Sequence, residues 1–270
     1  MAGDYYYPEA VDAPNRMEKV LKTFIILATL CMGGIIVWLF AITPFRPFLR
    51  IDISGFDRLE KSEILAIAGI SSNASFFSTN AAAVERSLMQ YAAFESARVF
   101  KHFPDRLQIV LEGRRPVASA FAVVHGLTVP VMIDRHGVIF QVGADERGLP
   151  FPAAMPVISG LIIEEPFPGM RLPLMFTSLF QSLENIIASD PELLLGLSEI
   201  RINRRAFDGF DLVLYPVHRR IRVRLSALNA DILRYALLMV DVLAANESGI
   251  NTLDFRSGIA SYIYEGAHSE

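Results

Sequence analysis

An uninterrupted apolar segment near the N-terminus limits what this chain can fold into. Residues 23–42 (TFIILATLCMGGIIVWLFAI) contain no charged side chain. In an α-helix, about 20 residues at about 1.5 Å per residue match a bilayer hydrocarbon core of about 30 Å. Trp38 and Phe40 stand near the end of the segment, where aromatic rings favour the membrane interface, and Pro44 and Pro47 end the helix beyond it. We therefore predict one transmembrane helix over residues 23–42.

The residues on either side of this segment indicate whether it is cleaved and how it is oriented in the membrane. A cleaved signal peptide is the alternative, but signal peptides have apolar cores of about 7–15 residues and a small-residue cleavage site, and neither is present. Basic residues flank the segment on both sides, so the positive-inside rule does not decide its orientation. A short tail before one early hydrophobic segment is typical of a signal anchor. We therefore expect residues 1–22 to be a disordered cytoplasmic tail, with the C-terminal part periplasmic or extracytoplasmic.

The composition of the chain excludes several classes of function. The only cysteine, Cys31, lies inside the apolar segment, which leaves the rest of the chain without thiols for disulfides or zinc. The formal net charge of −4 argues against a nucleic-acid binder. The motifs GxSxG, HExxH and GxGxxG are absent, and the five histidines are scattered singly. Asp134 precedes a turn and could act as a general base, but an Asp there commonly bonds the local backbone. We predict no enzyme, cofactor, metal site or small-molecule substrate.

Hydrophobic periodicity over residues 49–118 predicts a first domain with the order β-α-α-β-β. Period-two alternation indicates strands, and apolar residues at helical spacing indicate two helices. Such a unit is a two-layer α/β sandwich of about 70 residues, with both helices on one face of the sheet. A Pro-containing spacer over residues 43–48 precedes it. The expected elements are strands at 49–55, 96–103 and 106–112, and helices at 61–68 and 80–91.

Residues 119–265 predict a second, β-rich domain with a large sheet and two helices, so that the whole chain is α+β. A helix over 174–188 should bury one stripe of apolar side chains, and a second helix over 230–245 should be capped by Asn229. The expected stripe consists of Phe176, Leu179, Phe180, Leu183 and Ile187. The expected strands are 117–124, 129–134, 138–142, 210–215, 220–225, 252–255 and 259–264.

Two surfaces of the second domain are candidates for binding. The terminal strand 259–264 (IASYIY) is apolar and lacks Pro and Lys, so as an edge strand it would be open to pairing with another chain. An interior position in the sheet fits its composition equally well. Strand alternation also places Arg220, Arg222 and Arg224 on one face. That face is either simply solvated or a docking site for an acidic partner or anionic lipid headgroups.

Five short motifs, in this order and spacing, resemble the FtsQ/DivIB family of bacterial cell-division proteins. One position departs from the family pattern, because Gly113 stands where the family carries Glu and Glu112 is displaced by one. The motifs are Ile51-x-Ile53-x-Gly55, Phe103-Pro104-Asp105-Arg106-Leu107, Arg114-Arg115-Pro116-Val117-Ala118, Ile133-Asp134-Arg135-His136-Gly137-Val138-Ile139-Phe140 and Leu253-Asp254-Phe255-Arg256.

The resemblance implies a single-pass protein of the cell inner membrane, at the division septum, with a POTRA domain followed by a β-domain. It implies a non-enzymatic divisome scaffold that binds FtsB- and FtsL-like coiled-coil membrane proteins and so controls septal peptidoglycan synthesis by FtsW and FtsI. A partner strand would be added to the last strand, and Ile263→Pro should abolish that binding by removing a backbone donor. The matching positions are Arg256, Ser257, Gly258, Ile259, Tyr262, Ile263 and Tyr264.

Two other functions compete with this one. A POTRA-bearing component of outer-membrane protein assembly or secretion usually continues into a transmembrane barrel of strands of about ten residues, a pattern not seen here. A membrane-anchored cell-wall hydrolase would need paired acids or a metal site in a cleft.

Overall fold

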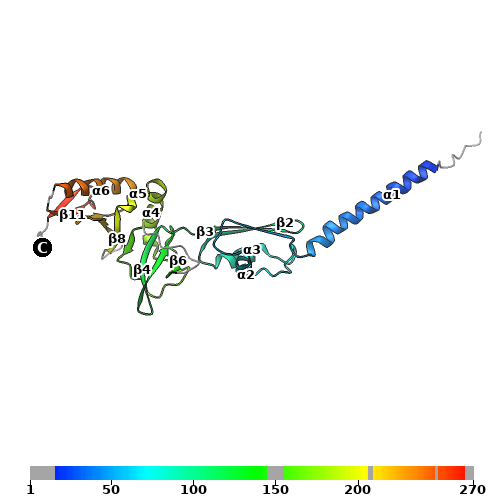
Figure 1. The fold of residues 1–270 in the computed structure, drawn as a ribbon, viewed down its shortest axis with the longest axis horizontal. Coiled ribbons are helices and arrows are strands. Elements are labelled where there is room, and N and C mark those ends of the chain that lie inside the picture. Colours follow the sequence, from blue (N-terminus) through cyan, green and yellow to red (C-terminus); the bar gives the residue numbers. More distant parts are fainter. Residues whose placement is uncertain (1–15, 145–154, 206–208, 247–248, 265–270) are drawn as a thin grey trace, which may run out of the picture.

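The structure is a computed structural model that describes residues 16–144, 155–205, 209–246 and 249–264. The molecule is elongated: a long helix extends from one end, and two domains follow it in line (Figure 1). The fold is α+β, as the sequence predicts.

The N-terminal helix α1 (Arg16–Val37) continues into a π-helical turn (Trp38–Ile42) and a 3-10 turn (Thr43–Phe45). This continuous span is long and apolar enough to cross a membrane, and its apolar window is not buried against the rest of the protein. The structure therefore confirms an apolar helix over the predicted segment, long enough to cross a membrane, but this helix begins earlier than expected. Residues 16–22 extend the helix, with Lys22 paired to Glu18 at 2.6 Å, so the expected disordered tail is wrong there. Residues 1–15 of the expected tail lie outside the described residues.

The predicted spacer after the helix is bound to the first domain by backbone contacts on both sides. Pro47 forms a β-bridge with Ser75, and the Phe48 N–H donates to the Ala74 carbonyl at 3.0 Å. The Leu49 N–H donates to the Asp105 carbonyl at 3.0 Å. The helix is therefore joined to the domain by an ordered connection.

The first domain has the predicted β-α-α-β-β order. Its three-stranded sheet has the order β1-β3-β2, with β1 parallel and β2 antiparallel to β3. Apolar residues of both helices and all three strands form its core, and Asn80 caps α3 by accepting from the Ala83 N–H at 3.3 Å. Its elements are β1 (Arg50–Ser54), α2 (Lys61–Ile67), α3 (Ala81–Met89), β2 (Phe94–His102) and β3 (Arg106–Gly113).

Two glycines of this domain are required by close packing. Gly55 has φ +91°, and a Cβ there would clash with the carbonyl oxygen of Leu111. At Gly113, a Cβ would lie 2.7 Å from the ring of Phe56, which packs edge-on against the buried Phe94 with centroids 4.9 Å apart. At Gly113, where the sequence departs from the family pattern, the Phe56 ring occupies the space that a side chain would need.

The second domain is built on one nine-stranded sheet with the order β12-β11-β10-β9-β8-β7-β4-β5-β6. The pairs β4–β7, β7–β8 and β10–β11 are parallel, and the other neighbours are antiparallel. Its strands are β4 (Ala118–Val124), β5 (Leu127–Ile133), β6 (Ile139–Val142), β7 (Val157–Ser159), β8 (Leu197–Arg204), β9 (Phe210–Pro216), β10 (Arg222–Leu225), β11 (Ile250–Asp254) and β12 (Ser261–Tyr264).

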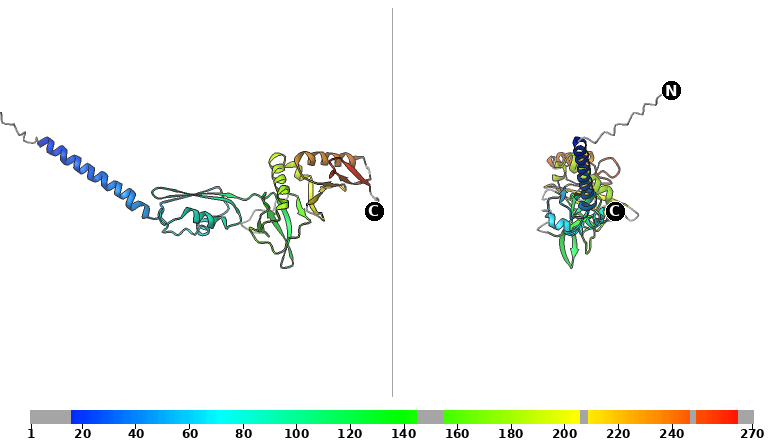
Figure 2. Two further views of the ribbon diagram at one scale, coloured as in Figure 1. Left: turned by 180° about the vertical axis from the view of Figure 1, so that it is seen from behind. Right: turned by 90° about the vertical axis from the view of Figure 1, so that its right-hand side faces the viewer.

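Helices α4 (Thr177–Ser189), α5 (Glu192–Leu195) and α6 (Ala230–Ala245) lie together on one side of this sheet (Figure 2). A 3-10 turn (Leu174–Phe176) leads into α4, and the predicted stripe is buried except that Ile186, not Ile187, is its last fully buried member. Asn229 caps α6 as predicted, accepting from the Ile232 N–H at 2.8 Å. The strands β7 and β8 and the short helix α5 were not predicted.

Candidate partner-binding edge

The terminal strand β12 lies at one end of the nine-stranded sheet, which decides the alternative that its composition left open. Among the described residues, its only strand neighbour is β11. Its tyrosines are exposed, Tyr262 by 45% and Tyr264 by 57%. Within the described part of the chain, the strand therefore has one free edge.

The hydrogen bonds of β11 show which residues of β12 face that edge. The Phe255 N–H donates to the Arg224 carbonyl of β10 at 2.9 Å, so the backbone of residue 255 points towards β10. Because backbone direction alternates along a strand, Asp254 points towards β12, where it is opposite Ser261. Along the following residues of β12, the backbone N–H and C=O groups point alternately away from β11 and towards it. Two residues have their N–H and C=O groups directed outwards, Tyr262 and Tyr264.

This register changes the expected effect of a proline at Ile263. Ile263 is opposite Thr252, so its backbone faces β11 and not the free edge. Proline there would remove a bond within the sheet of the chain itself. A proline that blocks an added strand, while leaving the existing ladder intact, belongs at Tyr262.

The helix-bearing side of the sheet includes an exposed apolar surface that the sequence analysis did not predict. Tyr262 is opposite the buried core residue Leu253, so it lies on the face of the sheet that carries the helices. On that side, the outer surface of α6 exposes a stripe of Tyr235, Leu238 and Val242. These residues recur at helical spacing, so α6 is apolar on two sides. The inward stripe alone was predicted, although the spacing of the outer stripe is also present in the sequence.

The turn before β12 is held by an ion-pair network. Arg256 pairs with Asp254 at 2.6 Å and with Asp211 at 3.2 Å, and Asp211 also pairs with Arg205. The hydrogen bond from Arg256 holds the pKa of Asp254 below its ordinary value, against the opposing effect of burial. The bond from Arg205 does the same for the pKa of Asp211. Arg256, expected to bind a partner, is thus engaged within the chain and positions the turn.

The other predicted residues of this turn lie between β11 and β12. Gly258 has φ +82°, and its N–H donates to the Phe255 carbonyl at 3.0 Å. The Ser257 hydroxyl donates to the carbonyl of Ile259 at 3.2 Å, and the Ile259 side chain is exposed. The predicted site residues 256–264 therefore form one continuous turn and strand at the sheet edge.

The predicted basic face is smaller than expected because β10 begins at Arg222. Arg222 and Arg224 share a face of the sheet, whereas Arg220 lies before the strand. The charge of Arg224 also contributes to lowering the pKa of Asp254. Arg220 and Arg222 line a concavity of about 750 Å³ together with Arg219, which pairs with Asp241 at 2.8 Å.

Comparison with known families bears on the first domain. Residues 46–114 match the family described as POTRA domain, FtsQ-type. The first domain is an FtsQ-type POTRA domain. Together with the apolar N-terminal helix, the match is consistent with an FtsQ/DivIB-like protein and supports a division-protein family. No curated protein matches the chain.

Asp134, the candidate general base, is a structural residue at the junction of the POTRA domain and the β-domain. It is 1% exposed and accepts hydrogen bonds from the N–H groups of His136 at 2.9 Å and Val138 at 2.7 Å. It also forms an ion pair with Arg114, whose Nε donates to the Ala92 carbonyl of the POTRA domain at 3.0 Å. These contacts fit the local-turn interpretation and engage both carboxylate oxygens of Asp134 within the chain.

A second set of ion pairs crosses the same junction. Arg135 of the β-domain pairs with Glu95 of the POTRA domain at 2.5 Å and with Glu184 of α4 at 3.1 Å. The hydrogen bond to Glu95 raises the pKa of Arg135 above its ordinary value. His136 Nε2 lies 3.2 Å from the same Glu95 oxygen. Sequence reasoning missed this junction because it joins residues far apart in the chain.

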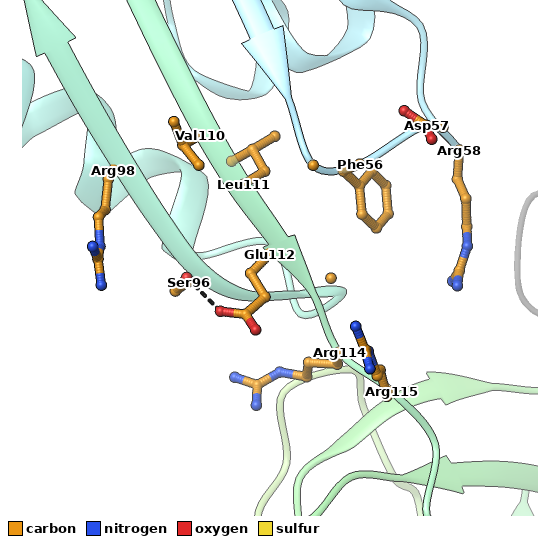
Figure 3. Close-up of a pocket in the computed structure, with 12 residues that line it drawn as sticks. Phe56, Asp57, Arg58, Ser96, Arg98, Val110, Leu111, Glu112, Arg114 and Arg115 are labelled. Carbon is orange, nitrogen blue, oxygen red and sulfur yellow. Dashed lines mark hydrogen bonds between the residues drawn. The ribbon is translucent and has the colours of Figure 1, made fainter. Parts of the chain in front are cut away.

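A concavity of about 640 Å³ lies on the POTRA side of this junction (Figure 3). Its charged lining is mainly basic, with four arginines and two carboxylates: Arg58, Arg98, Arg114, Arg115, Asp57 and Glu112. Ser96 donates to Glu112 at 3.1 Å, but the two residues are direct neighbours across β2 and β3, so this bond belongs to the sheet. Among the described residues, no group of three or more His, Cys, Asp or Glu side chains could hold a metal ion.

Proposed function

We propose that this chain is a membrane-anchored, non-enzymatic scaffold of the divisome. In this role β12 binds FtsB- and FtsL-like coiled-coil membrane proteins, which links them to septal peptidoglycan synthesis by FtsW- and FtsI-type proteins. The N-terminus is cytoplasmic, and the POTRA domain and β-domain lie on the other side of the membrane at the septum. The FtsQ-type POTRA domain behind an apolar helix supports this assignment.

The free edge of β12 carries the proposal. A partner strand would bond to the outward backbone groups of Tyr262 and Tyr264, which supplies affinity, while their rings add selectivity. A coiled-coil partner also brings an amphipathic helix. The exposed stripe of Tyr235, Leu238 and Val242 on α6 offers an apolar surface for such a helix on the same side of the sheet.

The first test is affinity capture of the intact chain from crosslinked native membranes, with the bound proteins identified by mass spectrometry. We expect small coiled-coil membrane proteins together with a septal peptidoglycan synthase. Capture of outer-membrane assembly factors would contradict the proposal and favour the competing POTRA function.

The second test places the interface at the outward backbone of β12. Tyr262→Pro and Tyr262→Ala both remove the ring, but only proline also removes the N–H, and proline is tolerated where an edge N–H faces solvent. The lost bond and the unpaired partner carbonyl together cost about 2–4 kcal/mol. At about 1.4 kcal/mol per tenfold change, proline should bind the soluble part of an FtsB-like partner roughly 30- to 700-fold more weakly than alanine. Equal affinities of the two variants, by calorimetric titration, would exclude strand addition at this position.

A further inference from the structure

An unbroken series of phenylalanine rings joins the membrane helix to the POTRA domain. The ring of Phe40, in the π-helical turn, lies 5.1 Å from Phe103 at the tip of the β2–β3 hairpin. The ring centroid of Phe103 lies 5.7 Å from that of Phe76, which lies 5.5 Å from that of Phe77. The ring centroid of Phe77 lies 5.0 Å from that of Phe45, at the end of the helix. We call these five residues the ring cluster.

Much of the ring cluster is open to its surroundings. Phe40, Phe45, Phe77 and Phe103 are all exposed, and Leu49 beside them is 85% exposed. Contiguous exposed aromatic side chains of this kind mark an interaction site in a soluble domain. The cluster lies at the end of the POTRA domain that adjoins the C-terminal end of the N-terminal helix, because the β2–β3 hairpin reaches back to that helix end (Figures 1 and 2).

The position of Phe40 in the apolar segment indicates that lipid surrounds the ring cluster. Phe40 lies inside the apolar segment 23–42, about 3 Å along the helix axis from its end at the usual rise per residue. The polar interface of a bilayer adds about 5–8 Å beyond the hydrocarbon core on each side. A ring 5.1 Å from Phe40 therefore lies within the interface or at its boundary with the hydrocarbon, so Phe103 meets lipid.

The cluster is also held rigidly in this position. Lys101 Nζ donates to the carbonyls of Phe76 and Thr79, each at 2.8 Å, and its ammonium group lies 4.7 Å from the centre of the Phe76 ring. These contacts fix the loop that presents Phe77. On the helix side, the Arg46 guanidinium lies 4.6 Å from the centre of the Trp38 ring, which places a cation beside the interfacial tryptophan.

We propose that the ring cluster is a lipid-binding surface that docks the end of the POTRA domain into the interfacial layer of the bilayer. Aromatic rings are favoured at that depth, and Arg46 is placed to meet lipid phosphates. The POTRA domain is then a fixed extension of the membrane helix and not a body on a flexible tether. This proposal requires only that α1 spans a membrane and is independent of partner binding by β12.

The test uses the full chain in phosphatidylethanolamine–phosphatidylglycerol nanodiscs that contain lipids brominated high on the acyl chain. Trp38 is the only tryptophan of the chain, so single-tryptophan probes are made in a Trp38→Phe background. Phe103→Trp and Phe77→Trp place probes in the cluster. Phe121→Trp is the control, because Phe121 is 54% exposed, like Phe103 at 44%, but lies in the β-domain.

We expect brominated lipid to quench the tryptophan fluorescence of probes 103 and 77 but not that of probe 121. Aqueous acrylamide should quench probe 121 several-fold more strongly than the other two probes. Quenching of the native Trp38 by brominated lipid first establishes that the helix is inserted. If both cluster probes respond to the two quenchers as probe 121 does, while Trp38 is quenched by lipid, the docking proposal is wrong.

Discussion

Replacing Asp134 distinguishes a structural anchor from a catalytic base. In Asp134→Ala, the N–H groups of His136 and Val138 lose their acceptor, and the largely buried Arg114 loses its counter-ion. Removing one partner of a buried ion pair costs about 3–5 kcal/mol, and each unpaired buried N–H costs about 1–3 kcal/mol. Because these losses overlap, we expect the free energy of unfolding to fall by about 3–6 kcal/mol, a large part of the 5–15 kcal/mol typical of a domain.

Asp134→Asn is the matched control, since its amide oxygen can still accept from both backbone N–H groups. We expect a smaller loss, about 2–3 kcal/mol, that reflects mainly the uncompensated charge of Arg114. Urea unfolding of the full chain in nonionic detergent, followed by circular dichroism, measures both values. An unchanged unfolding midpoint in Asp134→Ala would refute the anchor role. A folded Asp134→Asn protein that no longer supports division in cells lacking the native protein would instead favour catalysis.

Two further predictions concern packing and pH. Gly113→Ala should destabilise the POTRA domain by about 1–3 kcal/mol because its methyl group meets the Phe56 ring. In a Phe56→Leu background, the same substitution should cost less. Thermal unfolding of the single and double variants measures both costs. The pKa values of Asp211 and Asp254 are lowered in the folded state, so the stability that they contribute is complete above about pH 4 and is lost as the pH falls through the folded pKa values. Urea midpoints measured from about pH 6 to about pH 3 should therefore decline less steeply in Asp254→Asn than in the native chain.

The POTRA domain could be predicted because its signals are local. The alternation before Gly55, the cap at Asn80 and the turn before Arg106 each mark the bound of an element within a few residues. The sequence of β8 also alternates, with Ile200 and Ile202 buried between polar neighbours, and it was overlooked. The three-residue strand β7 is too short to show any periodicity.

The order of the strands in the β-domain could not be predicted from local patterns. Whether β12 is an edge or an interior strand depends on whether another strand lies beside it, and Tyr262 and Tyr264 suit either position. The direction of their backbone groups depends on the register with β11, which a single hydrogen bond from Phe255 reveals. The ion pair of Arg114 with Asp134 likewise joins two domains. The residues next to each of them in the sequence do not indicate this pairing.

The contacts along the long axis of the molecule determine where the edge of β12 stands relative to the membrane. In the proposed role, membrane-anchored partners would meet this edge at an effective concentration that depends on how narrowly the height and direction of the edge are fixed. A flexible spacer after the helix would spread β12 over many heights and lower that concentration. Instead, the spacer is bonded to the POTRA domain, and Arg114 and Arg135 fix the POTRA domain to the β-domain. In the proposed scaffold role, the junction residues would therefore contribute to partner binding although none of them lies at the edge of β12.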